Sequence, residues 1–286
     1  LLLPYAPLQH LLFAEKPGPL VMTSGNPSNE PLTCDNDEAL RRLGNLADAF
    51  LMHDRDIRRR VDDSVVIASS VGVTPIRRAR GFAPSAVVMP KPTSRPVLAV
   101  GGELKNTICL YSGQDAVLSE HLGDLKSPET YRHFLGTIDK FAELLRVRPE
   151  CIAYDLHPAY LSTQYARQQH VPLFAVQHHH AHIVSCMAEH GTYDPVIGVS
   201  CDGTGYGDDG AIWGCEILRA DAASYRRLAH LRYFALPGGD AAAEQTFRSA
   251  RAVLDQIDRP LAEGFLSGMK SPDRLASRGM VEQLLR

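Results

Sequence analysis

The sequence predicts an α/β protein with two domains. Short apolar runs, with the length of buried strands, alternate with segments in which apolar residues recur every three or four positions, as in amphipathic helices. The chain has 286 residues, which is more than most single hydrophobic cores hold. Residues 84–96 are rich in proline and lack periodicity, so we place a linker there and expect domains at residues 1–90 and 91–286.

Composition and charge narrow the class of protein. Hydrophobic residues make up 44% of the chain and charged residues 22%, as in ordinary soluble globular proteins. The net charge of -3 argues against a large basic surface for nucleic acid, and no apolar run is long enough to cross a membrane. The six cysteines form no C-x-x-C pair and lie mostly in apolar runs, so we expect buried, reduced thiols in a cytoplasmic protein.

The two ends of the sequence differ from natural termini. Leu1–Leu3 are apolar but have neither an initiating Met nor a basic leader, so they do not form a signal peptide. Residues 279–286 keep a helical pattern to the last position. We therefore interpret the sequence as a piece of a longer protein.

In the first domain, helices are expected at residues 8–14 and 35–50 and a buried strand at residues 19–22. The strand leads into a dense polar turn, residues 23–31. Hydroxyls and amides at the carboxyl end of a strand can bind a nucleotide or substrate. Gly-Asn-Pro and Ser-Asn also form ordinary turns, and the residues alone favour that second interpretation.

Arginines are concentrated in two later segments of the first domain. They stand between aspartates at residues 53–67 and recur at residues 76–82. Guanidinium groups pair with phosphate oxygens, so these segments suit an anionic pocket such as one for a triphosphate. The alternative is a solvated loop with surface ion pairs, which the residues alone favour.

The second domain contains two similar units of strand, Gly-rich turn and strand, at residues 97–111 and 196–218. Between them, Ser127 and Pro128 mark the start of a helix that we expect to end near Leu145. The predicted strands lie at residues 97–100, 107–111, 151–155, 173–176, 196–201 and 211–218.

A histidine-rich segment, residues 178–182, follows one of these strands. It is expected to form the first turn of a helix, on which His178 and His182 share a face because they are four residues apart. Two imidazoles on one face supply half of a transition-metal site. The alternative is a helix start whose rings only form hydrogen bonds or face water.

Two polar turns are candidates for phosphate and metal binding. Asp202 follows a buried strand and precedes a Gly-rich stretch, residues 203–210. Glycines let backbone N–H groups approach phosphate, and a carboxylate can hold a metal; the alternative is a plain hairpin turn. Residues 236–240 form another such turn before a helix expected from about Ala241, and helix N-termini favour anions.

Taken together, the motifs resemble those of a known family. Segments similar to the second half of a YrdC/Sua5-like domain are residues 23–26, 54–57, 62–65 and 78–81. Segments similar to a Kae1-like domain, which has the actin-like ATPase (ASKHA) fold, are residues 102–106, 119–125, 155–158, 178–182, 202–207 and 236–240. This order of domains resembles the HypF family over nearly the whole chain.

The resemblance implies an ATP-dependent carbamoyltransferase of NiFe-hydrogenase maturation. Its YrdC-like domain would form carbamoyl-adenylate from carbamoyl phosphate and ATP, since adenylation gives carbamate a better leaving group. Its Kae1-like domain would pass the carbamoyl group to the C-terminal cysteine of HypE, for synthesis of the cyanide ligand of the iron.

The resemblance also implies site residues and cofactors. Arg58 and Arg80 are the expected catalytic residues, because guanidinium groups stabilise triphosphate and pyrophosphate charge. The expected nucleotide- and carbamoyl-binding residues are Ser24, Asn26, Lys105, Asn106, Gly203, Thr204, Gly205, Gly238, Gly239 and Asp240. ATP and Mg2+ are the expected cofactors, together with zinc or iron. The expected ligands of that metal are His178, His182 and Asp202.

The sequence departs from the family pattern in several places. Cys215 stands where the family has Gly. The family's acylphosphatase domain, zinc-finger modules, first half of the YrdC-like domain and last part of the Kae1-like domain are not in this sequence. We therefore do not expect the piece alone to run the full reaction.

Three alternatives remain. A threonylcarbamoyl-type enzyme that modifies tRNA is disfavoured by the net negative charge and by the His-His-His-Ala-His form of residues 178–182. An O-carbamoyltransferase of the antibiotic type has the two domains in the opposite order. A non-catalytic scaffold for hydrogenase maturation would form neither AMP nor pyrophosphate.

Overall fold

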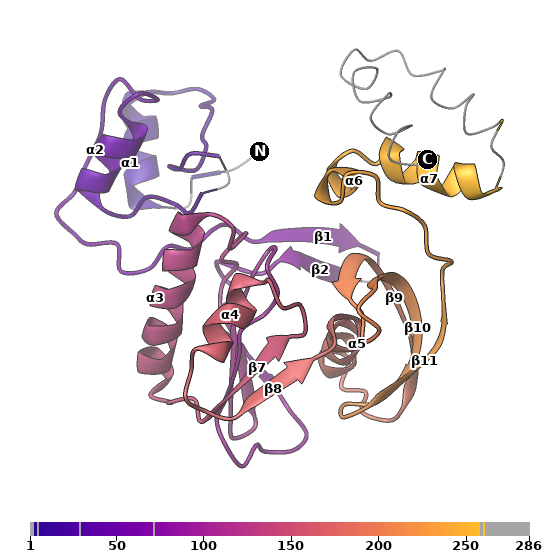
Figure 1. Ribbon diagram of the computed structural model, residues 1–286. Coiled ribbons are helices and arrows are strands. Elements are labelled where there is room, and N and C mark those ends of the chain that lie inside the picture. Colours follow the sequence, from indigo (N-terminus) through magenta and orange to yellow (C-terminus); the bar gives the residue numbers. More distant parts are fainter. Residues whose placement is uncertain (1–2, 5, 29, 71, 258–259, 261–286) are drawn as a thin grey trace. The chain divides into compact units, whose positions relative to one another are not determined.

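The computed structural model describes residues 3–4, 6–28, 30–70, 72–257 and 260. The chain forms two compact units (Figure 1). The first contains the described residues up to Tyr154 together with Ala159–Phe174, and the second contains Asp155–Pro158 and the described residues from Ala175 onward. Both contain helices and strands, which confirms the predicted α/β class.

The N-terminal part of the first unit holds two helices and a hairpin. These are α1 (Pro7–Glu15), α2 (Asn36–Leu43), β1 (Val65–Ser69) and β2 (Gly72–Arg77). Asp35 caps α2 by accepting a hydrogen bond from the Glu38 N–H at 2.8 Å. The helix ends at Leu43, so the prediction of a helix as far as residue 50 was wrong.

The strand predicted at residues 19–22 is not present. The Val21 side chain there is 98% exposed. A strand needs a partner for its backbone hydrogen bonds, and none of the strands in the described part of the chain pairs with this segment. Apolar character alone therefore gave the wrong prediction here.

A six-stranded sheet runs in the order β3-β6-β5-β4-β7-β8. β4 and β7 are parallel, whereas the neighbours among β3, β6, β5 and β4 are antiparallel. The strands are β3 (Ala86–Val88), β4 (Val97–Ala99), β5 (Cys109–Ser112), β6 (Asp115–Leu118), β7 (Cys151–Asp155) and β8 (Leu173–Val176).

Helix α3 (Pro128–Leu145) supplies one side of the core of the first unit. The Ser127 side chain caps it, as predicted, by accepting a hydrogen bond from the Thr130 N–H. Phe134, Ile138 and Phe141 lie on its buried face because helical residues three and four apart share a face. The shorter helix α4 (Leu161–Arg167) packs on the same core through Ala166.

The proline-rich segment is not a free linker. β3 lies within it and pairs with β6 at the edge of the sheet. Further along the segment, the backbone N–H groups of Met89 and Thr93 donate to the carbonyls of Gln114 and Gly113, both at 2.8 Å. The expectation of an unstructured connection at residues 84–96 was therefore wrong.

The second unit is a three-stranded antiparallel sheet with helix α5 (His178–Glu189) against it. The helix contributes Ile183 and Met187 to this core. A Cβ atom at Gly198 would lie 2.4 Å from the Ile183 side chain, so glycine permits the close approach of helix and strand. The other elements are β9 (Val196–Tyr206), β10 (Ile212–Ala220), β11 (Tyr225–His230), α6 (Asp240–Glu244) and α7 (Phe247–Ile257).

The cysteines are all free thiols, but most are not buried. Cys151 is buried, whereas Cys186 and Cys201 are exposed. An apolar run in the sequence therefore did not predict burial, because one side of a helix or strand can still face outward. None of the described helices has the length and apolar content that crossing a membrane requires.

Candidate functional site

The histidine segment has the predicted strand-to-helix geometry. β8 ends at Val176, and the Gln177 side chain caps α5 by accepting a hydrogen bond from the His180 N–H at 2.9 Å. His178 is thus the first residue of the helix, and His182 lies one turn further on the same face.

Three side chains converge at this end of α5. The Nε2 atoms of His178 and His182 are 3.2 Å apart. The Asp202 Oδ2 atom lies 3.0 Å from His178 Nε2 and 3.8 Å from His182 Nε2. One ligand atom from each residue lies within 4.8 Å of the others, which suits one ion with bonds of about 2.0–2.2 Å. The predicted convergence of these three residues is therefore present.

A fourth side chain orients the cluster. The Asp155 carboxylate, at the end of β7 and only 8% exposed, lies 2.6 Å from His178 Nδ1. Metal-binding histidines commonly present their other ring nitrogen to a carboxylate, which fixes ring orientation and tautomer. Sequence reasoning assigned no role to Asp155. The signal available in the sequence was its position at the end of a predicted buried strand, where Asp202 was also expected.

The electrostatics match this arrangement. Hydrogen bonds with Asp155 and then Asp202 raise the pKa of His178 to about 9. Burial lowers the pKa of His182, and the neighbouring His178 lowers it further. Burial raises the pKa of Asp202, but the hydrogen bond with His178 and one from the Gly203 N–H outweigh it and leave that pKa below its usual value. A cation bound here would replace the His178 proton.

The other two histidines of the segment are structural. His179 is fully buried, with its Nδ1 atom 3.1 Å from the Gln177 side chain. His180 Nε2 lies 2.7 Å from the Asp221 carbonyl oxygen, and its ring packs on Tyr225. Their predicted position on other faces of the helix is confirmed.

A β-bulge, rather than a hairpin turn, orients the Asp202 side chain. β9 continues to Tyr206, so the prediction that the strand ends at Cys201 was wrong. Cys201 pairs with Cys215 and Gly205 pairs with Trp213, so that Gly214 alone faces the segment 202–204. Such bulges redirect side chains. Gly205 permits close approach to the histidines, since a Cβ atom there would lie 2.5 Å from the His179 ring.

The glycine turn at residues 236–240 takes no part in the contacts described above for His178, His182 and Asp202. Gly238 and Gly239 have φ values of 89° and 58°, which explains why glycine is required at both positions. Asp240 begins the short helix α6. Nothing in the described contacts places a phosphate site at this turn.

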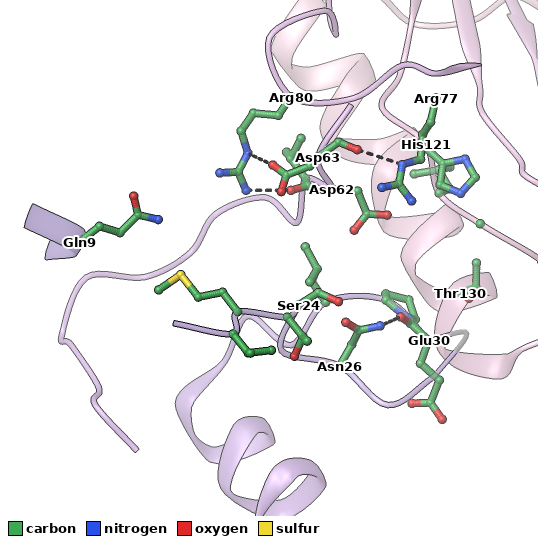
Figure 2. A pocket seen from close by; sticks show the side chains of 18 of the residues that line it. Gln9, Ser24, Asn26, Glu30, Asp62, Asp63, Arg77, Arg80, His121 and Thr130 are labelled. Atoms are coloured by element: carbon green, nitrogen blue, oxygen red, sulfur yellow. Dashed lines mark hydrogen bonds and ion pairs between the residues drawn. The ribbon is translucent and has the colours of Figure 1, made fainter. Parts of the chain in front are cut away.

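A second candidate site is a cavity of about 1460 Å³ in the first unit. Figure 2 shows Arg77, Arg80 and His121 on one side of it and Ser24 and Asn26 on the other. The predicted binding residues Ser24, Asn26 and Lys105 line it, and so does the predicted catalytic residue Arg80. The other polar residues of the lining include Asp62, Asp63, Asp124 and Thr130.

The basic groups of this cavity are held by local contacts. Arg80 Nε lies 3.4 Å from the Asp63 carboxylate, and Arg77 Nε donates to the Asp63 carbonyl oxygen at 2.9 Å (Figure 2). Lys105 donates its backbone N–H to the Asp124 carboxylate at 2.8 Å. Burial lowers the pKa of His121, which therefore favours the neutral form. The lining thus combines three cationic side chains with the carboxylates of Glu30, Asp62, Asp63 and Asp124. The cations suit phosphate oxygens, and carboxylates can hold a divalent cation that accompanies a polyphosphate.

Two predicted residues of the first unit do not line this cavity. Arg58 is exposed and absent from the lining, and its carbonyl oxygen accepts a bond from Lys140 Nζ at 3.3 Å. Asn106 is 1% exposed and donates to the carbonyls of Val100 and Gly102. The shared-cleft prediction was thus wrong for Arg58, because neighbouring residues of an extended segment point in different directions. Asn106 supports its own turn.

Models of known protein families match three consecutive segments of the chain. The family described as HypF Kae1-like domain matches residues 92–189, and the second subdomain of the carbamoyltransferase Kae1-like domain matches residues 198–284. The Sua5–YciO–YrdC family, described as telomere recombination, matches residues 1–79. The chain is thus a YrdC-like segment followed by a Kae1-like segment.

Relatives with both segments are named HypF. Carbamoyltransferase HypF2 of Cupriavidus necator is 46% identical over 279 residues, which cover 90% of this chain and 34% of that protein. HypF of Synechocystis sp. is 46% identical over 254 residues, covering 88% and 33%. A crystal structure of full-length HypF, in a phosphate- and nucleotide-bound form, has a TM-score of 0.89 and 44% identity, covering 99% of this chain and 44% of that one. The chain belongs to the HypF family, and it spans only part of the length of these relatives.

Proposed function

We propose that this chain is part of a carbamoyltransferase of NiFe-hydrogenase maturation that acts in the cytoplasm. The observation that carries the proposal is the convergence of His178, His182 and Asp202, accompanied in the same chain by a cavity whose lining includes two arginines and a lysine. The names of the relatives support the reaction class, and the nucleotide-bound form of one of them supports ATP as a substrate.

In the proposed first step, carbamoyl phosphate is hydrolysed to carbamate and phosphate. A carbamate oxygen then attacks the α-phosphorus of ATP and pyrophosphate leaves. The product, carbamoyl-adenylate, carries AMP as its leaving group. Arg77, Arg80 and Lys105 would neutralise the charge that accumulates on the departing pyrophosphate. Asp62 and Asp124 are the cavity residues suited to hold Mg2+ with the triphosphate. Ser24 and Asn26 would orient the carbamoyl group.

In the proposed second step, the C-terminal cysteine thiolate of HypE attacks the carbamoyl carbon and AMP leaves. His178, His182 and Asp202 fit zinc or iron, because two imidazole nitrogens and one carboxylate leave a coordination position open. A bound metal would act as a Lewis acid towards phosphate or carbamoyl oxygens. Asp155 would keep the His178 ring turned so that Nε2 faces that position.

The adenylation step can be tested by ATP–pyrophosphate exchange in the protein extended to the length of its relatives. We expect carbamate-dependent exchange in the wild type and a fall of at least about 100-fold in Arg80→Ala, as when a group that stabilises transition-state charge is lost. Arg58→Ala is the matched control and should retain exchange, since that side chain lies outside the cavity lining. Equal losses in both variants would contradict the assignment of Arg80. Absence of exchange in the wild type would favour the scaffold alternative.

A further inference from the structure

Two cysteines face each other directly across β9 and β10. Cys201 and Cys215 are paired residues of these antiparallel strands, and their sulfur atoms are 3.5 Å apart. Directly paired residues in such strands have Cα atoms about 4.5–5.5 Å apart, which is inside the range of about 4.4–6.8 Å that a disulfide requires. Closing the bond thus requires side-chain rotation but no separation or sliding of the strands.

The position of the pair links it to the candidate metal centre. Immediately after Cys201, the ladder opens into the bulge that carries Asp202, and it closes again only at Gly205 and Trp213. Cys201 and Cys215 therefore form the last regular cross-strand pair before Asp202 leaves the ladder. A covalent bond between them would fix one end of the bulge.

The pair is also reachable by small molecules. Cys201 is exposed and Cys215 is half-buried, and both are free thiols. Cys201 projects from the same side of β9 as Ile197 and Val199, each 61% exposed. A thiol-reactive molecule can thus approach Cys201 from that side of the sheet.

We propose that Cys201 and Cys215 are a reversible dithiol–disulfide site that clamps the bulge carrying Asp202. The oxidant is a low-molecular-weight disulfide such as glutathione disulfide. The Cys201 sulfur attacks it and releases one thiol, forming a mixed disulfide; the Cys215 sulfur then attacks the Cys201 sulfur and releases the second thiol. The two protein thiols lose two protons and two electrons, and the small disulfide is reduced to two thiols.

The test is to treat the chain with glutathione disulfide, block remaining thiols with an alkylating agent, and digest with chymotrypsin. Cleavage after Tyr206 and Trp213 separates the two cysteines, so a disulfide leaves two joined peptides that reductant releases. We expect the joined peptides in the wild type and in Cys186→Ser, which removes the other exposed thiol of the second unit, and none in Cys201→Ser. Separate alkylated or glutathionylated peptides, or a bond to Cys186, would overturn the proposal.

The clamp itself is tested by amide hydrogen exchange of residues 202–206 before and after oxidation. This measurement needs no bound metal, so its outcome does not depend on whether the proposed function is correct. A bond across one end of a short loop removes open states of that loop, and we expect exchange to slow on the order of tenfold in the oxidised wild type. Unchanged exchange in a sample with the bond formed would refute the clamp.

Discussion

The substitution Asp155→Asn tests the electrostatics of the metal-free histidine cluster. The pKa of His178 rises from 6.5 to about 9, with Asp155 as the largest cause. One pKa unit corresponds to about 1.4 kcal/mol, so the full shift corresponds to about 3 kcal/mol of stability, shared with Asp202. Asparagine keeps an acceptor for the His157 N–H that Asp155 Oδ1 binds, so the change removes mainly the charge.

The sign of the pH dependence follows from the raised pKa. The folded state holds the His178 proton more tightly than the unfolded state, so the contribution is complete below pH 6.5 and is lost as the pH rises through about 9. We expect Asp155→Asn to lower the unfolding free energy by about 1–2 kcal/mol at pH 6 and by almost nothing at pH 10.

The assay is urea denaturation with a metal chelator present, followed by tryptophan fluorescence. Trp213 is the one tryptophan in the sequence, and it lies 3% exposed in β10, so the signal reports on the unit that contains His178. Asp194→Asn, an exposed carboxylate in the same unit, is the control and should change stability by less than about 0.5 kcal/mol. An equal loss for Asp155→Asn at both pH values would refute the reasoning.

Two further predictions follow from the geometry. Zinc content should drop in His182→Ala but remain in His180→Ala, as elemental analysis would measure. Arg59→Ala should lower the unfolding free energy of the first unit by about 3 kcal/mol, because it leaves the fully buried Glu120 carboxylate, 3.2 Å from Arg59 Nε, without its cation.

Each of these predictions has an outcome that would contradict it. Equal zinc loss in both histidine variants would mean that helix damage, not ligand loss, releases the metal. A destabilisation below about 1 kcal/mol in Arg59→Ala, no larger than an exposed ion pair contributes, would show that water reaches Glu120.

The sequence predicted correctly those features that depend only on the spacing of nearby residues within one helix. The buried face of α3 follows directly from the spacing of Phe134, Ile138 and Phe141. His178 and His182 meet for the same reason, since helical geometry fixes residues four apart on one face. Both features depend only on nearby residues, so the sequence contained the information needed.

The features that were missed depend on distant partners. The bulge at Asp202 exists because three residues of β9 face Gly214 alone, and strand register is not visible in either strand separately. The role of Asp155 requires β7 to end beside α5. Arg58 was predicted to face the cleft, whereas the arginines that line the cavity are Arg77 and Arg80. Side-chain direction in an extended segment reverses at each residue, so only the fold decides which arginine faces the cavity.

The most direct test of the proposed function is transfer of a carbamoyl group to the C-terminal cysteine of HypE. The protein extended to the length of its relatives would be incubated with carbamoyl phosphate, ATP, Mg2+ and HypE, and the acceptor mass would be measured. The account predicts that HypE gains the mass of one carbamoyl group with the wild type. With Asp202→Asn, ATP–pyrophosphate exchange should continue while transfer falls at least about tenfold, as for loss of a metal ligand or its support. Undiminished transfer by Asp202→Asn, or no transfer by a wild type that exchanges pyrophosphate, would contradict it.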